Sequence, residues 1–138
     1  MEQYIVNNNM GYFIKVKGWI SKEQIINEYQ SSHVLIMPSI YEAMSISLLE
    51  SLACGCYVIT TPLNGVSEII SENGILVNLK SLEEIAKQIE EYFKNRFLSG
   101  YKANKENIDT LQKTHNWDHI TNNYNHIFET IASSKYKL

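Results

Sequence analysis

Short apolar runs alternate with amphipathic segments along the first two thirds of the chain. Three of these runs contain few polar residues and have the length of buried strands, namely His33–Met37, Tyr57–Thr60 and Ile75–Val77. A looser β-rich segment, Tyr12–Ile20, comes before them. We therefore expect four strands. Because the run before Pro38 has no polar alternation, we also expect both faces of that strand to be covered.

Helical segments are predicted between these strands. Ser21–Gln24 and Ser81–Glu84 both fit the capping box, in which a serine and an acidic or amide side chain three residues later bind each other's main-chain N–H groups. Further helical pieces are expected before Asn9, from about Ser45 to Cys54, and from Val66 to Ser71. Strands that alternate with helices predict an α/β fold with a parallel sheet, helices on both faces, and a ligand site at the carboxyl ends of the strands.

The chain from about residue 95 onward is expected to be a helical tail without further strands. Its last helix, from about Asp118 to Ile131, has one apolar stripe, which consists of Ile120, Tyr124, Ile127, Phe128 and Ile131. A stripe of this kind needs an apolar partner. We therefore expect it to be incompletely covered in the isolated chain and to favour self-association.

Composition and charge narrow the class of protein. The 138 residues are enough for one domain with a hydrophobic core, and 44% hydrophobic with 20% charged residues is ordinary for a globular protein. No apolar run approaches the roughly 18 residues that cross a membrane, and the chain does not open like a signal peptide. The net charge of -3 gives no broad positive field for nucleic acid. We predict one domain over residues 1–138, located in the cytoplasm, that binds no nucleic acid.

Cysteines and histidines give weak signals for a metal. Cys54 and Cys56 are the only cysteines, so a metal would need ligands from elsewhere, and we interpret them as small residues at a tight turn between helix and strand. His115 and His119 would share one face of a helix, which makes zinc conceivable. Trp117 between them favours packing instead, and no metal is expected.

The segment from Pro38 to Glu50 reads as the end of a strand, a short loop and the start of a helix. Glu42 lies in the loop and Glu50 lies inside the helix, with seven residues between them. Because helical side chains lean toward the N-terminus of their helix, both carboxylates could face a ligand above the helix start. The free N–H groups of a helix start also form a natural seat for a phosphate.

This spacing of two glutamates, after Pro-Ser and before Gly-x-x-Val-Ile, resembles the C-terminal, donor-binding half of retaining GT-B glycosyltransferases of the glycosyl transferases group 1 family. The resemblance runs from about residue 16 to residue 93 and continues more weakly to about residue 128. It implies a Rossmann-like domain that binds a nucleotide-sugar. It also implies transfer of a hexosyl group, with retention, to a glycan or lipid-linked acceptor without a metal or another cofactor. The cytoplasmic assignment then leaves room for peripheral attachment to the inner membrane face.

The resemblance assigns roles to the residues of the loop and helix start. Glu50 would bind the ribose hydroxyls, and Glu42 would contact the donor sugar at the catalytic centre. The backbone of the segment between them would bind the diphosphate, through Ala43, Met44, Ser45 and Ile46. The family often has glycine where Ala43 and Ser45 stand, which predicts looser donor binding here. Two alternatives stay open, since Ser47–Glu50 also fits a capping box and a loop glutamate such as Glu42 is often only solvated.

A second loop of the predicted sheet edge carries a further resemblance. Gly65-Val66-Ser67-Glu68 resembles the glycine and glutamate that face the donor pocket in the family. Glu68 is weighed evenly between a role in the site and a structural role. We expect Glu42 to lie in a solvent-reachable cleft near Gly65 and Glu68, because both loops follow strands of one parallel sheet.

Two parts of the family pattern have no counterpart in these 138 residues. The first domain, which holds the acceptor, would need more chain, and residues 7–17 contain no glycine-rich loop with arginine and lysine for the diphosphate. Two functions therefore remain. The chain is either the donor half of a glycosyltransferase, with a first domain in cis or in trans, or a degenerate GT-B-like module for binding or assembly. The chain alone is expected to transfer no sugar in either case.

Overall fold

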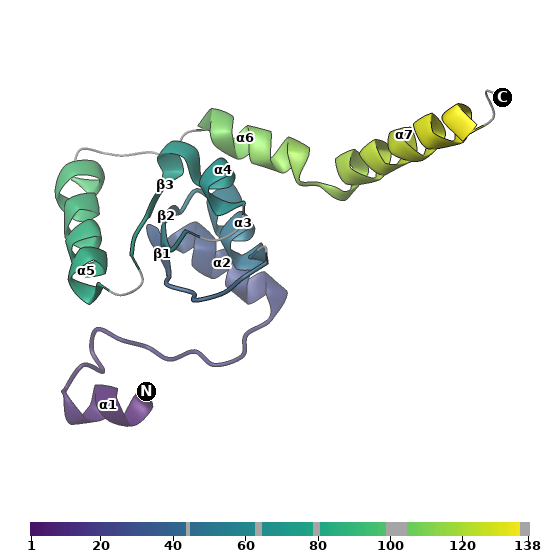
Figure 1. Cartoon of the computed structure of the whole chain (residues 1–138). Helices are drawn as coiled ribbons and strands as arrows, with labels where there is room; N and C mark the ends of the chain where they lie inside the picture. Colours follow the sequence, from purple (N-terminus) through teal and green to yellow (C-terminus); the bar gives the residue numbers. More distant parts are fainter. Residues whose placement is uncertain (44, 63–64, 79–80, 99–104, 136–138) are drawn as a thin grey trace.

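A computed structural model of the chain describes residues 1–43, 45–62, 65–78, 81–98 and 105–135 (Figure 1). The elements follow one another as α1 (Glu2–Asn7), α2 (Lys22–Ser31), β1 (Val34–Met37), α3 (Ile46–Ala53), β2 (Tyr57–Thr60), α4 (Val66–Ile70), the 3₁₀ turn η1 (Ser71–Asn73), β3 (Gly74–Leu76), α5 (Leu82–Glu91), the π-helical turn η2 (Tyr92–Phe97), α6 (Lys105–Thr114) and α7 (Trp117–Lys135). Strands and helices thus alternate, as the sequence predicts.

Three parallel strands form the sheet in the order β1-β2-β3. The register pairs Val34 with Tyr57 across β1 and β2, and Ile59 with Ile75 across β2 and β3. All four residues of the central strand β2 are buried. The predicted α/β fold with a parallel sheet is therefore confirmed.

Helices cover both faces of this sheet, because successive side chains of β2 point to opposite sides. Val58 packs into a cluster from α3, α4 and α6, which also contains Leu48, Leu52, Val66, Ile69, Ile70 and Leu111. Tyr57 and Ile59 pack on the other face with residues of α5, η2 and the end of β3. Figure 1 shows α5 on one side of the sheet, with α3 and α4 on the other. This arrangement confirms the predicted layers.

The predicted strand Tyr12–Ile20 is wrong. The segment has no regular structure, and the side chains of Tyr12 and Trp19 are 89% and 103% exposed. A strand needs a neighbour for its main-chain hydrogen bonds. Within the described part of the chain the sheet ends at β1, and this segment does not pair with it. Its apolar side chains therefore remain in solvent.

The prediction that both faces of the strand before Pro38 are covered is also wrong. Ile36 in β1 is 43% exposed, whereas Leu35 and Met37 pack against the cluster around α3. β1 is an edge strand, so the helices that cover β2 and β3 from the Ile36 side do not extend over all of it. Burial of an edge strand depends on its neighbours in space, which the apolar run itself does not encode.

Serine caps start several of the helices. The predicted capping box of Ser21 is complete, since its side chain accepts from Gln24 N and Gln24 accepts from Ser21 N. Ser81 caps α5 by accepting from Glu84 N at 3.0 Å, but the Glu84 carboxylate accepts from Asn78 N instead of completing the box.

The helical tail predicted from about residue 95 begins inside the domain. Leu111 of α6 is buried in the cluster around α3, so α6 belongs to the packed body. The last helix, α7, leads away from that body (Figure 1), as expected for a helix with an uncovered stripe. None of the described helices is long and apolar enough to cross a membrane.

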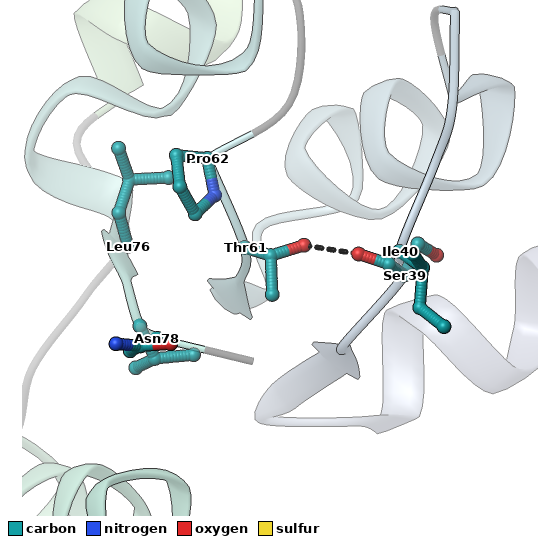
Figure 2. Close-up of a pocket in the computed structure, with 7 residues that line it drawn as sticks. Ser39, Ile40, Thr61, Pro62, Leu76 and Asn78 are labelled. Atoms are coloured by element: carbon teal, nitrogen blue, oxygen red, sulfur yellow. Dashed lines mark hydrogen bonds between the residues drawn. The ribbon is translucent and has the colours of Figure 1, made fainter. Parts of the chain in front are cut away.

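Two buried hydroxyls tie the carboxyl end of β1 to the end of β2. Thr60 Oγ1 donates to Met37 O at 2.9 Å, and Thr61 Oγ1 donates to Ser39 O at 2.6 Å (Figure 2). Both threonines are buried. The loop after β1 is therefore held in place by the next strand at the edge where a ligand site is expected.

The two cysteines lie at a tight turn between α3 and β2, as predicted. Gly55 takes a left-handed conformation with φ 89°, which favours glycine, and Cys56 N donates to Ser51 O at 3.0 Å. The buried Cys56 thiol donates to Tyr29 O at 3.1 Å and so connects the end of α2 to β2. Burial, with a smaller effect of Cys54, raises the pKa of Cys56 to about 11.

The tie at the sheet edge predicts the effect of Thr61→Val. This substitution keeps the shape of the side chain but leaves Ser39 O without its donor, so the free energy of unfolding should fall by roughly 1–3 kcal/mol. Thr130→Val is a matched control, because the Thr130 hydroxyl also donates to a main-chain carbonyl, that of His126, but on an exposed helix. Its effect should stay within about 0.5 kcal/mol. Equal losses in denaturant titrations would contradict the tie.

The raised pKa of Cys56 predicts a loss of stability at alkaline pH. The thiol ionises near its ordinary pKa of 9.0 in the unfolded chain and near 11 in the folded chain. Folding should therefore be most favourable below pH 9 and weaken as the pH rises toward 11. Denaturant titrations across this range should show a smaller decline for Cys56→Ala. Part of the decline should remain, because burial also raises the pKa of Tyr57 and Tyr92. Equal declines in parent and variant would disprove the role of Cys56.

Candidate functional site

The loops that follow the strands enclose a cavity at the carboxyl edge of the sheet. It has a volume of about 480 Å³ and is lined by Ser39, Ile40, Thr61, Pro62, Leu76, Val77 and Asn78 (Figure 2). This volume lies in the range of small-molecule sites. The lining supplies hydroxyl, amide and apolar groups but no charged side chain among the described residues. The sheet edge is thus hollow where the fold predicts a ligand.

The start of α3 is fixed beside this edge by Ser45. Its buried hydroxyl accepts from Leu48 N at 3.4 Å and donates to Met37 Sδ at 3.1 Å, so the helix start is attached to the end of β1. The amides of Ile46 and Ser47 have no acceptor among the described residues. Amides of this kind can bind an anion.

The alternative role of Glu50 in a capping box is wrong. Ser45, not Ser47, is the N-cap of α3, and Ser47 lies inside the helix with an exposed side chain. Glu50 therefore sits in the second turn, too far along the helix to cap it. Its carboxylate is available for another purpose.

Glu50 is half-buried and lines a second cavity, of about 790 Å³, between α3, the start of α2 and the junction of α6 with α7. The lining residues are Lys22, Ile46, Leu49, Glu50, Ala53, Leu111, Gln112, His115, Trp117 and Ile120. The walls are largely apolar, with the carboxylate of Glu50 and the ammonium group of Lys22 as the charged groups. An apolar cavity with a carboxylate suits a flat ring that carries neighbouring hydroxyl groups.

The structure does not gather all the predicted site residues. Glu42 is half-buried in the loop after β1 and Ala43 is exposed, and neither lines the two cavities above. Met44 lies outside the described residues. The role of the loop as a whole therefore stays a prediction, whereas Ile46 and Glu50 do share a cavity.

Gly65 and Glu68 line a third cavity, of about 400 Å³, with residues of α4, η1 and α6. Gly65 precedes α4 with φ 73°, a left-handed conformation that favours glycine, and Glu68 is exposed in the first turn of this helix. Glu42 is not among the lining residues, so the expected neighbourhood of Glu42, Gly65 and Glu68 does not form one cavity. The loops themselves do lie at one edge, as the bond between Thr61 and Ser39 requires.

His115 and Lys22 are site residues that sequence reasoning missed. His115 lines both the cavity of Glu50 and that of Glu68. Its Nδ1 lies 2.8 Å from Thr114 Oγ1, whose proton goes to Thr110 O, so Nδ1–H donates and Nε2 is left as an acceptor. The spacing of four residues between Leu111, which is in the core, and His115 was the signal that could have placed His115 beside the domain body.

The described histidines form no metal centre. His115 binds Thr114, and His119 Nε2 lies 2.9 Å from the amide of Asn123. Within the described ranges, no three side chains of His, Cys, Asp or Glu come together as metal ligands do. The expectation that the protein uses no metal stays a prediction.

Comparison with known proteins gives a consistent family. The model of the family described as "Glycosyl transferases group 1" matches residues 2–113. An uncharacterized glycosyltransferase of Methanocaldococcus jannaschii is 30% identical over 105 residues, which are 75% of this chain and 27% of that protein. A human relative, one of the subunits of phosphatidylinositol N-acetylglucosaminyltransferase, is 22% identical over 120 residues, which are 86% of this chain and 25% of that protein.

A solved structure supports the fold. Sucrose-phosphate synthase from Thermosynechococcus elongatus superimposes with a TM-score of 0.79 at 23% identity, over 96% of this chain and 34% of that chain. The chain thus spans about a quarter to a third of these proteins. The family model covers most of the chain and agrees with the parallel sheet and with the two glutamates around α3. The chain belongs to the glycosyl transferases group 1 family.

Proposed function

We propose that this chain is the donor half of a glycosyltransferase and binds the nucleotide part of a nucleotide-sugar in the cavity of Glu50. The observation that carries the proposal is the place of Glu50, half-buried in a largely apolar cavity one turn beyond the free amides of α3. The remaining steps of the argument fit the parts of the donor to this arrangement.

The nucleoside fits the lining of the 790 Å³ cavity. Its base would lie against apolar surface such as that of Leu49 and Ile46, and two ribose hydroxyls would donate to the Glu50 carboxylate. Lys22 in the same lining supplies the positive charge closest to a bound diphosphate that these cavities offer. His115 Nε2 is an additional acceptor for a hydroxyl or base N–H group.

The diphosphate fits the start of α3. Four residues separate Ile46 from Glu50, so the free amides lie about 6 Å along the helix axis from the residue that would hold the ribose. This is about the distance from a ribose to its diphosphate. Ala43, Met44, Ser45 and Ile46 would surround the phosphates, in accordance with the family resemblance.

The sugar would then extend toward the carboxyl edge of the sheet. The 480 Å³ cavity there offers the hydroxyl of Thr61 and the amide of Asn78, and Glu42 belongs to the same loop as Ser39 in its lining. Gly65 and Glu68 would border the donor from the next loop, since their cavity shares Leu111 and His115 with that of Glu50. We propose Glu42 as the carboxylate that contacts the reacting sugar.

The whole protein would transfer a hexosyl group with retention to a glycan or lipid-linked acceptor. The human relative is named for transfer to phosphatidylinositol, which agrees with a lipid-linked acceptor and with action at the inner membrane face from the cytoplasm. A first GT-B domain, in cis or as a separate chain, would hold that acceptor.

A degenerate binding or assembly module is the second candidate. It is favoured by the low positive charge of the site, because Lys22 is the lysine or arginine among the described residues that line the three cavities. Leaving-group stabilisation by positive groups is usually a large part of catalysis in such reactions. Binding and transfer therefore need separate tests.

The role of Glu50 predicts the effect of Glu50→Gln on nucleotide affinity. Loss of a charged hydrogen bond to the ribose should weaken binding of UDP, GDP or ADP by roughly 1.5–3 kcal/mol. Isothermal titration of the parent and the variant would measure this difference. Glu90→Gln is a matched control with the same change of charge on α5, where Glu90 pairs with Lys94 in solvent. Equal affinities for parent and Glu50→Gln would rule out the ribose contact.

Sugar transfer is expected only when the acceptor-binding domain is present. Positioning of two reactants accounts for about 7–11 kcal/mol of a barrier, and the described cavities of this chain offer a place for the donor only. A panel of nucleotide-sugars and simple acceptors should show no turnover by the chain alone and turnover with a first-domain partner. Robust turnover by the chain alone would contradict this expectation. Nucleotide binding without turnover in both assays would support the module instead.

A further inference from the structure

The helix α7 presents an apolar surface that the rest of the described chain does not cover. The side chains of Tyr124, Ile127, Phe128 and Ile131 are between 50% and 63% exposed, and α7 leads away from the body of the domain (Figure 1). In the described part of the chain it is the beginning of the helix that meets the body, where Trp117 and Ile120 line the cavity beside α3. The apolar surface therefore continues from the domain along the free helix.

The spacing of these residues is that of a coiled-coil seam. Apolar residues stand at positions 117, 120, 124, 127 and 131, so that intervals of three and four residues alternate. This repeat of 3.5 residues keeps one narrow stripe facing a single partner helix along its whole length. From 117 to 131 the seam is about 21 Å long, and Phe128 widens it on one side.

The charges of α7 lie away from this seam. Asp118 and Glu129 fall on the opposite side of the helix, and the positions that flank the seam hold Thr121, Asn123 and Thr130. When two copies pair, these flanking positions meet each other across the interface. A second copy of α7 would thus meet neither a like charge nor a buried charge. The same flanks offer no charge by which a different partner helix could be selected.

We propose that α7 is a self-association surface, on which two copies of this chain pair along the seam formed by Tyr124, Ile127, Phe128 and Ile131. Pairing removes these side chains from water, and the projection of α7 from the domain leaves room for a second helix. The partner is a second copy because the seam is apolar, regular and free of opposing charge.

Sedimentation velocity of the full chain over a concentration series tests this proposal. The parent should form dimers, and the double variant Ile127→Glu/Ile131→Glu should dissociate at least about tenfold more readily, because it places carboxylates in the apolar contact. Both isoleucines are exposed in the single chain, so the variant should fold, which circular dichroism would verify. Asn122→Glu adds a charge on the opposite side of α7 and should dimerise like the parent.

Hydrogen exchange separates pairing from other ways of covering the helix. Protection of the α7 amides should rise with protein concentration in the parent and in Asn122→Glu, but not in the double variant. A parent that stays monomeric at its highest soluble concentration would overturn the proposal, as would protection of α7 that does not depend on concentration. A dimer that the double variant does not weaken, or that Asn122→Glu weakens equally, would overturn it as well.

Discussion

The complete burial of β2 is the constraint on which the rest of the structure depends. This strand has a parallel neighbour on each side and a helical layer on each face, and each of its residues makes a separate contact. Val58 packs toward α3 and α4, while Ile59 packs toward α5. Thr60 uses its hydroxyl to tie the end of β1. Because all three strands are parallel, their loops emerge at one edge, and the cavity there follows from the way the core is packed.

The helix α3 transmits this order from the core to the candidate site. Leu48 and Leu52 are one turn apart and fully buried, which fixes the rotation of the helix against the sheet. The opposite side of α3 then has to carry Ile46 and Glu50, and both line the 790 Å³ cavity. The position of Glu50 is thus a consequence of two leucines in the core. Ser45 fixes the position of the helix start in the same way, through its bond to Met37.

Local patterns predicted most of the elements correctly, and the errors concern contacts between distant segments. The capping box of Ser21 and the apolar run of β2 are local signals, and both were confirmed. The segment 12–20 has the composition of a strand but no partner beside it, which its own residues cannot reveal. Ser47–Glu50 matched a capping pattern, yet Ser45 starts the helix two residues earlier because it also binds Met37.

The candidate site shows the same division. The place of a ligand at the carboxyl edge follows from strand order, and the cavity is found there. Which side chains line each cavity depends on how α2, α6 and α7 pack around α3, so the sequence missed Lys22 and His115. It also placed Glu42 with Gly65 and Glu68, which the structure assigns to different surroundings.

The most direct test of the central claim is an amide-resolved NMR titration of the chain with a nucleoside diphosphate. If the nucleotide occupies the cavity of Glu50 with its phosphates at the start of α3, the amides of Lys22, Ile46, Ser47 and Glu50 should shift together as one saturable process. The amides of α5, on the other face of the sheet, should keep their positions. No shifts at saturating nucleotide, or shifts concentrated on α5, would contradict a donor site in this cavity.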